Sequence, residues 1–230
     1  MVRALFFDVF GTVVDWRGGV AREARRILEP LGITIDWIAF ADAWRDCYQP
    51  TMQKVRSGQM PYANLDVLHR DNLEQIKGKF GLDRLDDATL AALNLAWHRL
   101  DAWDDAKRAF PRLHRRFLMA PVSNGNIAIM VDIARHNGIV WDAILGAEIA
   151  RDFKPKPRVY LSAVEALALR PEECMMVAAH SSDLAAAKAN GLKTAFVARP
   201  NEGPGRESAP AQPFDVVASS FDELAQKLGA

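Results

Sequence analysis

Residues 4–12 read ALFFDVFGT and decide the fold of this chain. Their first four residues are apolar without a break, which is typical of a strand buried on both faces of a parallel sheet. The run ends at Asp8, and Gly11 permits a tight turn soon after it. Ligands of open parallel sheets bind at the carboxyl ends of the strands. Asp8 is therefore expected to face a ligand, although a strand-end Asp can also cap the next segment or bind loop amides.

The composition is that of a globular protein with balanced charge. The chain has 230 residues, half of them hydrophobic, with six Trp and eleven Phe, which is enough for a core with a smaller inserted unit. Lys plus Arg and Asp plus Glu number 29 each, so no broad basic surface for nucleic acid is expected. No apolar stretch reaches the ~20 residues that cross a bilayer, so no membrane partner is expected.

The two cysteines, Cys47 and Cys174, favour a reducing compartment. They lie far apart and lack the spacing of metal ligands, so reduced structural thiols are expected. The first predicted strand begins so early that no signal peptide fits before it. A cytoplasmic protein is the resulting expectation.

Helical periodicity without strand patterns extends from residue 16 to residue 99. Four helices are predicted there, over residues 20–28, 36–50, 64–80 and from 87 onward. The second has Asp36 as its N-cap and is expected to end at Pro50. Its apolar side chains form one aromatic stripe, made of Trp37, Phe40, Ala41, Trp44 and Tyr48. We therefore expect a four-helix cap inserted after the first strand.

Strands and helices alternate after residue 100. Strands are predicted over 117–122, 144–149, 175–179, 193–197 and 214–217, and helices over 105–116, 158–169, 183–190 and 221–228. Pro111 should kink the first of these helices or mark its late start, and residues 201–213 are predicted to be an exposed loop. This alternation predicts a doubly wound, Rossmann-like parallel α/β sheet. Residues 1–15 and 100–230 would form this core, and residues 16–99 the helical cap.

Two loops in the second half carry candidate binding residues. Ser123-Asn124-Gly125 follows a predicted strand, and its hydroxyl and turn amides can bind an anion, although the same tripeptide is also an ordinary turn. Lys154 lies in a Pro-rich loop, and Pro157 suits the first turn of the next helix. A lysine fixed in this way can keep a carboxylate nucleophile ionised, whereas the simpler interpretation is a solvated lysine.

A last cluster combines His180 and Asp183 after the strand predicted over 175–179. Asp183 can cap the following helix, which does not exclude a catalytic role. The four clusters, in this order, strongly resemble the motifs of the haloacid dehalogenase superfamily. The first of those motifs is Asp-x-x-x-Thr after an apolar strand, and Asp8 and Thr12 match it. The resemblance implies that Asp8 is a covalent nucleophile.

Most members of that superfamily are magnesium-dependent phosphatases, and this chain departs from their pattern at two positions. Phe10 stands where they have a general-acid Asp, and Ala179 stands where they have an Asp that helps to hold magnesium. Both losses are hard to reconcile with phosphoryl transfer but suit a halide leaving group, which needs neither a proton nor a metal. The chain therefore resembles the type II 2-haloacid dehalogenase branch. A magnesium-dependent phosphatase or phosphonatase with an unusual metal site is the alternative.

The resemblance implies hydrolysis of short (S)-2-haloalkanoic acids to (R)-2-hydroxy acids, with no metal and no other cofactor. It implies that Asp8 attacks the halogen-bearing carbon and forms an aspartyl ester, with inversion at that carbon. Water oriented by Asp183 and Lys154 would then cleave the ester. Ser123, Thr12 and turn amides would hold the substrate carboxylate and the developing oxyanion.

The resemblance also implies a halide-binding arginine on the aromatic cap helix. Arg45 matches it, and together with Asn124 and the ring of Phe10 it would hold the departing halide. Local sequence alone equally allows a surface arginine paired with a neighbouring aspartate. The aromatic stripe is interpreted as cap core, with Trp44 or Tyr48 also facing the pocket.

Two residues differ from the usual pattern of this branch. Phe10 stands where Tyr is usual, which removes a hydroxyl from the halide pocket. His180 stands where Asn is usual, and it can donate a hydrogen bond or titrate near neutral pH. A bulkier His180 would shrink the pocket in favour of a small halide, which makes fluoroacetate a candidate substrate. The expected partners are a 2-haloacid and water. Members of the resembled family are often homodimers, so a homodimer is expected for this chain as well.

Overall fold

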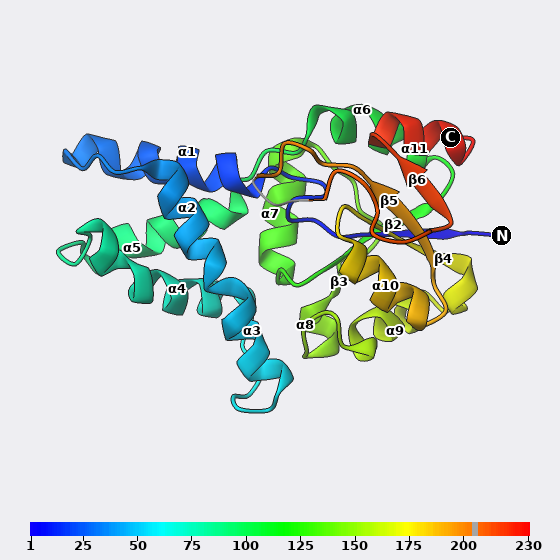
Figure 1. Ribbon diagram of the computed structural model, residues 1–230, viewed down its shortest axis with the longest axis horizontal. Coiled ribbons are helices and arrows are strands. Elements are labelled where there is room, and N and C mark those ends of the chain that lie inside the picture. The colour runs from blue at the N-terminus through cyan, green and yellow to red at the C-terminus, as the bar shows by residue number, and fades with distance from the viewer. Residues whose placement is uncertain (204–206) are drawn as a thin grey trace.

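The strand predicted from the opening run lies at the centre of a six-stranded parallel sheet (Figure 1). The computed structural model describes residues 1–203 and 207–230. The strand order is β3-β2-β1-β4-β5-β6, and every pairing is parallel. The strands are β1 (Ala4–Phe7), β2 (Leu118–Ser123), β3 (Leu145–Gly146), β4 (Cys174–Ala178), β5 (Lys193–Val197) and β6 (Val216–Ala218). The predicted doubly wound α/β fold is confirmed.

Both faces of β1 are buried, as its unbroken apolar run predicts. Leu5 and Phe7 pack into one hydrophobic cluster, whereas Ala4 and Phe6 pack into a second cluster on the opposite face. The strand is hydrogen-bonded to β2 on one side and to β4 on the other. β2 and β3 extend the sheet on one side of β1, and β4 to β6 extend it on the other. The strand order therefore reverses beside β1, and folds of this kind bind ligands at the carboxyl ends of the strands at such a switch point.

Two groups of helices cover the two faces of the sheet. The cluster of Leu5 and Phe7 includes side chains of α6 (Asp104–His114), α7 (Ile127–Asn137) and α11 (Phe221–Lys227). The cluster of Ala4 and Phe6 includes side chains of α8 (Ala147–Ala150), α9 (Pro157–Ala166) and α10 (Ser181–Ala189). Figure 1 shows α6 and α11 on one side of the strands and α9 and α10 on the other. The sheet is therefore a buried middle layer.

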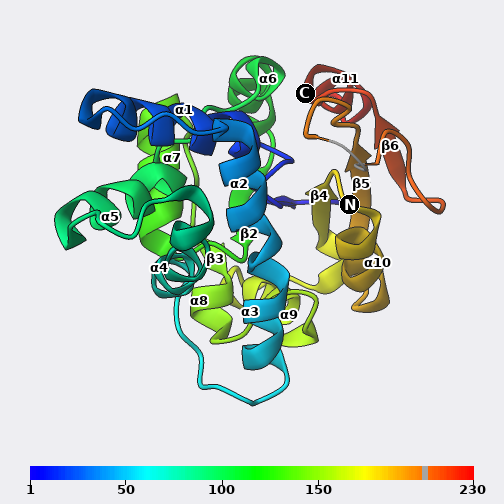
Figure 2. The ribbon, with the colours of Figure 1, turned by 60° about the vertical axis from the view of Figure 1, so that its left-hand side comes forward.

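Residues 16–99, called here the helical insertion, contain five α-helices that stand beside the sheet (Figures 1 and 2). They are α1 (Trp16–Leu28), α2 (Trp37–Asp46), α3 (Tyr48–Arg56), α4 (Leu65–Ile76) and α5 (Asp87–Asn94). The prediction of four helices was wrong because the helix expected over 36–50 breaks at Cys47. Pro50 lies in the first turn of α3, where its missing N–H leaves no helical hydrogen bond unmade. The domain boundaries at residues 15 and 99 stay a prediction.

Several further elements differ from the predictions. Residues 147–149, expected in a strand, belong to α8, and α7 was not predicted. Helix α6 runs through Pro111, so the late start was wrong. Helix α10 begins at Ser181, which puts Asp183 in its first turn and makes His180 the N-cap residue. Residues 204–206, part of the loop predicted over 201–213, lie outside the described residues.

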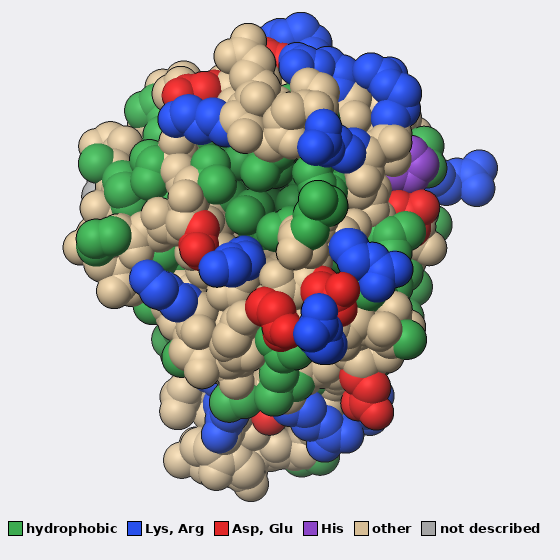
Figure 3. Space-filling view, turned by 90° about the vertical axis from the view of Figure 1, so that its right-hand side faces the viewer, with side chains coloured by type: hydrophobic (Ala, Val, Ile, Leu, Met, Phe, Trp, Pro, Cys, Tyr) green, Lys and Arg blue, Asp and Glu red, His purple; other side chains and the backbone are tan. Residues whose placement is uncertain are grey.

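The surface agrees with the balanced composition. On the face in Figure 3, basic and acidic side chains lie next to one another across the middle of the view. No helix among the described residues has the length and apolarity needed to cross a membrane. Cys47 and Cys174 are both free thiols.

Candidate active site

A cavity of about 390 Å³ lies at the carboxyl end of β1, where the sheet meets the helical insertion. It is lined by Asp8, Phe10, Arg45, Tyr48, Gln49, Asn124, Lys154, Pro155, Tyr160, His180, Ser182, Asp183 and Glu207. These residues come from segments that follow strands, from the Lys154 loop, from α2 and α3 of the insertion, and from α9 (Pro157–Ala166) and α10 (Ser181–Ala189). The structure thus brings together every residue predicted for the site except Thr12, Ser123 and Trp44.

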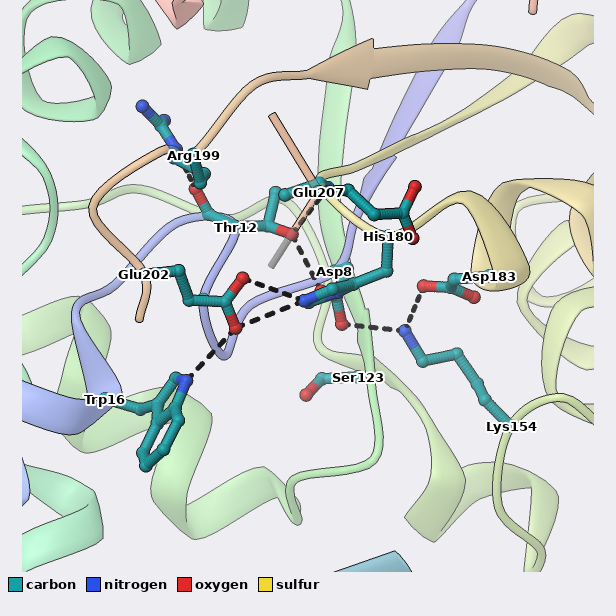
Figure 4. A network of polar contacts seen from close by, with 12 residues as sticks. Asp8, Thr12, Trp16, Ser123, Lys154, His180, Asp183, Arg199, Glu202 and Glu207 are labelled. Atoms are coloured by element: carbon teal, nitrogen blue, oxygen red, sulfur yellow. Dashed lines mark hydrogen bonds and ion pairs between the residues drawn. The ribbon is translucent and has the colours of Figure 1, made fainter. Parts of the chain in front are cut away.

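Asp8 is a buried carboxylate between two cationic side chains (Figure 4). Its Oδ1 accepts a hydrogen bond from Lys154 Nζ at 2.8 Å. Its Oδ2 accepts one from Thr12 Oγ1 at 2.7 Å and lies 3.0 Å from His180 Nδ1. Burial alone would raise the pKa of Asp8, but the charges and hydrogen bonds of Lys154 and His180 outweigh it and lower that pKa well below its usual range. Asp8 is therefore ionised.

Lys154 joins Asp8 to a second aspartate. Its Nζ donates to Asp183 Oδ2 at 2.5 Å, and its backbone N–H donates to Asn124 Oδ1 at 2.8 Å. Burial disfavours the charged amine, yet Asp183 and Asp8 outweigh it and raise the pKa of Lys154. Tyr160 donates its hydroxyl to Asp183 Oδ1 at 2.6 Å. Burial raises the pKa of Asp183 against the opposing charge of Lys154, which suits a proton acceptor.

His180 lies between two carboxylates. Its Nδ1 faces Asp8, and its Nε2 lies 3.0 Å from Glu202 Oε2. Trp16 Nε1 donates to Glu202 Oε1 at 3.1 Å, and Glu202 is only 1% exposed. Because ionised carboxylates only accept, both ring nitrogens act as donors. Burial opposes the charged ring, but hydrogen bonds to Asp8 and Glu202 raise the pKa of His180 to about 10.

Arg45 brings a third positive charge to the cavity, from α2, beside those of Lys154 and His180. Its guanidinium carbon lies 3.9 Å from the ring centroid of Tyr48 and 5.7 Å from that of Phe10. Its buried Nη1 has no hydrogen-bond partner among the described residues. The surface alternative fails, since Asp42 instead accepts two hydrogen bonds from Arg17. A buried cation with an unused donor is suited to bind an anion in this cavity.

The residues present do not fit a magnesium ion. Magnesium needs several oxygen ligands, usually with more than one carboxylate. Here Lys154 Nζ contacts both Asp8 and Asp183, and Ala179 offers no carboxylate. Among the residues described, no group of His, Cys, Asp and Glu has an arrangement suited to a metal. The pair of aspartates is joined by an ammonium group.

Comparison with known proteins agrees with this geometry. A family model described as haloacid dehalogenase-like hydrolase matches residues 2–191. The chain belongs to the haloacid dehalogenase-like hydrolase family. The (S)-2-haloacid dehalogenase 1 of Pseudomonas sp. strain CBS-3 is 29% identical over 99% of this chain and 96% of the relative.

Two solved structures are more similar in sequence. A defluorinating L-2-haloacid dehalogenase has a TM-score of 0.96 and 41% identity, covering 100% of this chain and 96% of that one. Another L-2-haloacid dehalogenase has a TM-score of 0.95 and 45% identity, covering 100% and 99%. The predicted membership of the type II 2-haloacid dehalogenase branch is confirmed.

Two hydroxyls of this haloacid dehalogenase-like hydrolase lie behind the cavity wall, which corrects the predicted substrate contacts. Thr12 Oγ1 donates to Asp8 and accepts from the N–H of Ala179 at 2.9 Å. Ser123 Oγ accepts from the N–H of Gly125 at 3.0 Å. Both residues are fully buried, and neither lines the cavity. Thr12 therefore orients the carboxylate of Asp8, and Ser123 shapes the turn that follows β2.

Trp44 also lies away from the cavity. It is fully buried, and its Nε1 donates to the carbonyl oxygen of His69 at 2.9 Å. Its ring packs edge-on against Phe40 and Trp97. The expectation that Trp44 faces the pocket was wrong. Its side chain lies in the core of the helical insertion, where it packs against Phe40 of the same aromatic stripe. The prediction for Tyr48 agrees with the cavity lining.

Sequence reasoning missed three acidic or phenolic residues of the hydrolase site: Tyr160, Glu202 and Glu207. Tyr160 follows the Lys154 loop on α9, where a buried tyrosine is common and gives no catalytic signal. Glu202 and Glu207 lie in the segment predicted to be an exposed loop, and the burial of Glu202 contradicts that prediction. Glu207 accepts from the backbone N–H of Ser181 at 3.0 Å and lines the cavity.

Proposed function

We propose that this hydrolase cleaves the carbon–halogen bond of short (S)-2-haloalkanoic acids and produces (R)-2-hydroxy acids. The observation that carries the proposal is an ionised, buried Asp8 whose cavity also contains the unpaired donor of Arg45. The first group supplies a nucleophile, and the second stabilises an anionic leaving group. Relatives named (S)-2-haloacid dehalogenase and L-2-haloacid dehalogenase support the same chemistry.

In the first step Asp8 attacks the carbon that carries the halogen. An electron pair of the carboxylate forms the new carbon–oxygen bond, and the carbon–halogen bond breaks with its pair on the halide. Attack from the side opposite the halogen inverts the configuration at carbon. Arg45, beside the rings of Phe10 and Tyr48, stabilises the departing halide.

In the second step water cleaves the resulting aspartyl ester at the carboxyl carbon of Asp8. Asp183 accepts a proton from this water, since Lys154 and Tyr160 fix its carboxylate beside the ester. The raised pKa of Asp183 favours that transfer. The oxygen of the product hydroxyl comes from Asp8, and the oxygen of water stays in the regenerated carboxylate. Of the water's two protons, one ends on the hydroxy acid and the other is released.

Fluoroacetate is the finer substrate proposal. His180 occupies the cavity wall beside Asp8 and leaves less room than a smaller side chain would. A compact pocket with charged donors favours a small halide that binds hydrogen-bond donors strongly. The relative that shares 41% identity over the whole chain is named as defluorinating. We expect fluoride release from fluoroacetate at a measurable rate beside chloride release from chloroacetate.

The proposal is tested by halide release from chloroacetate and fluoroacetate in excess EDTA. We expect turnover by the unmodified enzyme, and loss of at least about 10³-fold in Asp8→Asn, because the amide is not a nucleophile. Asp71→Asn, which removes an exposed carboxylate, is the matched control and should keep full activity. A single turnover in ¹⁸O-water should label the enzyme rather than the product. Magnesium-dependent cleavage of a phosphate ester without halide release would instead establish the phosphatase alternative.

A further inference from the structure

The two carboxylate oxygens of Asp8 have different partners. Among the hydrogen bonds of the described residues, Oδ1 has one donor, Lys154, whereas Oδ2 faces two, Thr12 and His180. A carboxylate oxygen has two in-plane lone pairs. Both lone pairs of Oδ2 are therefore engaged, and Oδ1 keeps one for attack on carbon. In the ester, Oδ1 bonds to the substrate and Oδ2 becomes the carbonyl oxygen.

The position of the His180 ring is fixed from its far side. Glu202 is buried, faces Nε2 through both carboxylate oxygens at 3.2 and 3.0 Å, and is held by Trp16 Nε1. This arrangement keeps a proton on each ring nitrogen and directs Nδ1–H at Asp8 Oδ2 (Figure 4). A ring with one proton would leave one of these carboxylates facing a lone pair.

We propose that His180 is a catalytic residue of ester hydrolysis, and that Glu202 is a positioning residue that keeps its ring charged and aimed. The Nδ1–H of His180 and the hydroxyl of Thr12 form the oxyanion hole for Asp8 Oδ2. This inference rests on the proposed function, because it concerns the second step of that reaction. The two donors that bind Asp8 Oδ2 in the free enzyme would thus also stabilise the negative charge on that oxygen during ester hydrolysis.

The electron movements of the step follow from the geometry. The oxygen of water bonds to the carboxyl carbon of Asp8, and the π pair of the carbonyl moves onto Oδ2. When that pair returns, the bond to Oδ1 breaks, and its pair stays with the oxygen of the hydroxy acid. That oxygen takes one proton of the water, and the other proton is released through Asp183. Oδ2 is most negative between these events, when His180 and Thr12 bind it most strongly.

His180 affects the two steps of the reaction differently. Before attack, its positive charge stabilises the carboxylate of Asp8 and does not favour the loss of that charge to carbon. In the ester the negative charge is absent, and it returns to Oδ2 only as water attacks. The imidazolium therefore accelerates hydrolysis without accelerating ester formation. A residue with a purely structural role would change both steps together.

Several charged groups surround the ring and set its response to pH. Asp8, directly after β1, and Glu202, after β5, contact the two nitrogens. Lys154 and Asp183 lie beyond Asp8, and Glu207 lines the same cavity. In the ester Asp8 carries no charge, so loss of the Glu202 charge removes the direct anionic partner that the ring still has among the described residues. In Glu202→Gln the alkaline limit of hydrolysis should therefore move to lower pH.

The experiment is rapid-quench kinetics with excess chloroacetate, in which chloride and the mass of the ester-modified enzyme are followed together. In His180→Asn and His180→Gln we expect hydrolysis to slow about 100-fold, as for loss of an oxyanion-hole donor, while ester formation is unchanged or faster. Chloride then appears as a burst of one equivalent, and the ester accumulates. Glu202→Gln should show a smaller effect with the shifted pH profile. Arg170→Gln, at an exposed position, is the control for a loss of surface charge.

Two other results would contradict the inference. If both His180 variants slow ester formation and accumulate no ester, His180 acts on the first step or only on structure. If hydrolysis proceeds at the unmodified rate in both variants, the oxyanion hole does not include His180. Failure of the proposed function is distinct, because the unmodified enzyme would then release no chloride and form no ester.

Discussion

Asp8 carries a negative charge inside the protein because two cations and a hydroxyl surround it. An isolated buried carboxylate would be neutral, since removal of a charge from water is costly unless it is paired. Lys154 and His180 supply that pairing, and Thr12 adds a hydrogen bond. The same contacts orient the carboxylate, with one donor on Oδ1 and two on Oδ2 among the described hydrogen bonds. Charge and orientation of the nucleophile thus have a common origin.

The pH dependence of activity should reflect His180. In the free enzyme the pKa of His180 is about 10, well above its ordinary value of 6.5, so the ring carries both protons throughout neutral pH. Formation of the ester removes the charge of Asp8 and leaves Glu202 as the anionic partner, so during hydrolysis the ring should lose its second proton at a pH below 10. We therefore expect kcat for chloroacetate to be constant around neutral pH and to fall in alkaline solution. Measurement of kcat between pH 6 and 11 tests this, and His180→Asn should lack the alkaline fall. A limb centred near pH 6.5 would show that Glu202 does not hold the second proton on the ring.

Lys154 should matter for stability as well as for activity. Its replacement by Met leaves Asp8 and Asp183 buried without the cation between them. Loss of one partner of a buried ion pair typically lowers the free energy of unfolding by about 3–5 kcal/mol. Urea denaturation of Lys154→Met measures this, and Lys156→Met, at an exposed position in the same loop, should change stability by less than about 0.5 kcal/mol. Equal stability of the two variants would argue against a charged Asp8–Lys154–Asp183 group.

The sequence predicted those elements in which local pattern and tertiary packing agree. The apolar run of β1 and the alternation after residue 100 were sufficient for the sheet, and Asp8, Lys154 and Asp183 follow elements of that alternation. Glu202 could not be predicted in this way. A loop rich in Gly and Pro is usually exposed, and the burial of Glu202 depends on contacts with Trp16, far away in sequence.

Other errors of the sequence-based prediction concern the direction in which a side chain points, not the type of residue. Thr12 and Ser123 were expected to contact the substrate, but sequence does not tell whether a hydroxyl faces a ligand or a backbone amide. Trp44 shares its stripe with Tyr48, and only the break between α2 and α3 separates the core residue from the cavity residue. The sequence predicts a helix end at Pro50, because a proline that follows the end of one helix cannot be told in sequence from a proline in the first turn of the next.

The cost of a proline to helix stability depends on its position, so two prolines of this chain serve as a test and its control. Pro111 lies inside α6 and is exposed, where it removes a hydrogen bond and crowds the preceding turn. Pro111→Ala should raise the free energy of unfolding by about 1–3 kcal/mol. Pro50→Ala, in the first turn of α3, should change it by less than about 1 kcal/mol. Thermal and urea unfolding of both variants measure the difference, and a destabilised Pro111→Ala would mean that α6 depends on a kink there.

At the scale of the whole molecule, the cavity depends on how the helical insertion is held against the sheet. Arg45 and Tyr48 come from the insertion, whereas Asp8 and Lys154 come from the sheet side. Arg56 of α3 donates to the carbonyl oxygen of Lys154 at 2.9 Å, so this contact ties the insertion directly to the Lys154 loop. Movement between the two parts would separate Asp8 from Arg45, the groups proposed above as the nucleophile and the binding site of the halide.

A second contact between the two parts is centred on His98. Its Nε2 lies 2.8 Å from Asp66 on α4, and its Nδ1 lies 2.7 Å from Asp132 on α7. Asp66 also accepts from the side-chain amide of Asn126, directly before α7. Burial opposes the charged ring, but hydrogen bonds to Asp66 and Asp132 raise the pKa of His98 above its usual value. The charged ring therefore connects the insertion to the sheet region.

This contact should make the attachment of the insertion sensitive to pH. Because the folded-state pKa of His98 is raised, its stabilisation is complete below about pH 6.5 and is lost as the pH rises through the raised value. His98→Gln should lower the free energy of unfolding at pH 6 by about 1–3 kcal/mol and reduce the decline in stability above that pH. Amide hydrogen exchange in α4 and α7 should be faster in the variant, because the His98 ring that contacts Asp66 on α4 and Asp132 on α7 is lost. His136→Gln removes a half-exposed ring paired with Asp101 and should leave exchange in α4 unchanged. Equal exchange in α4 for both variants would show that His98 does not hold α4 against α7.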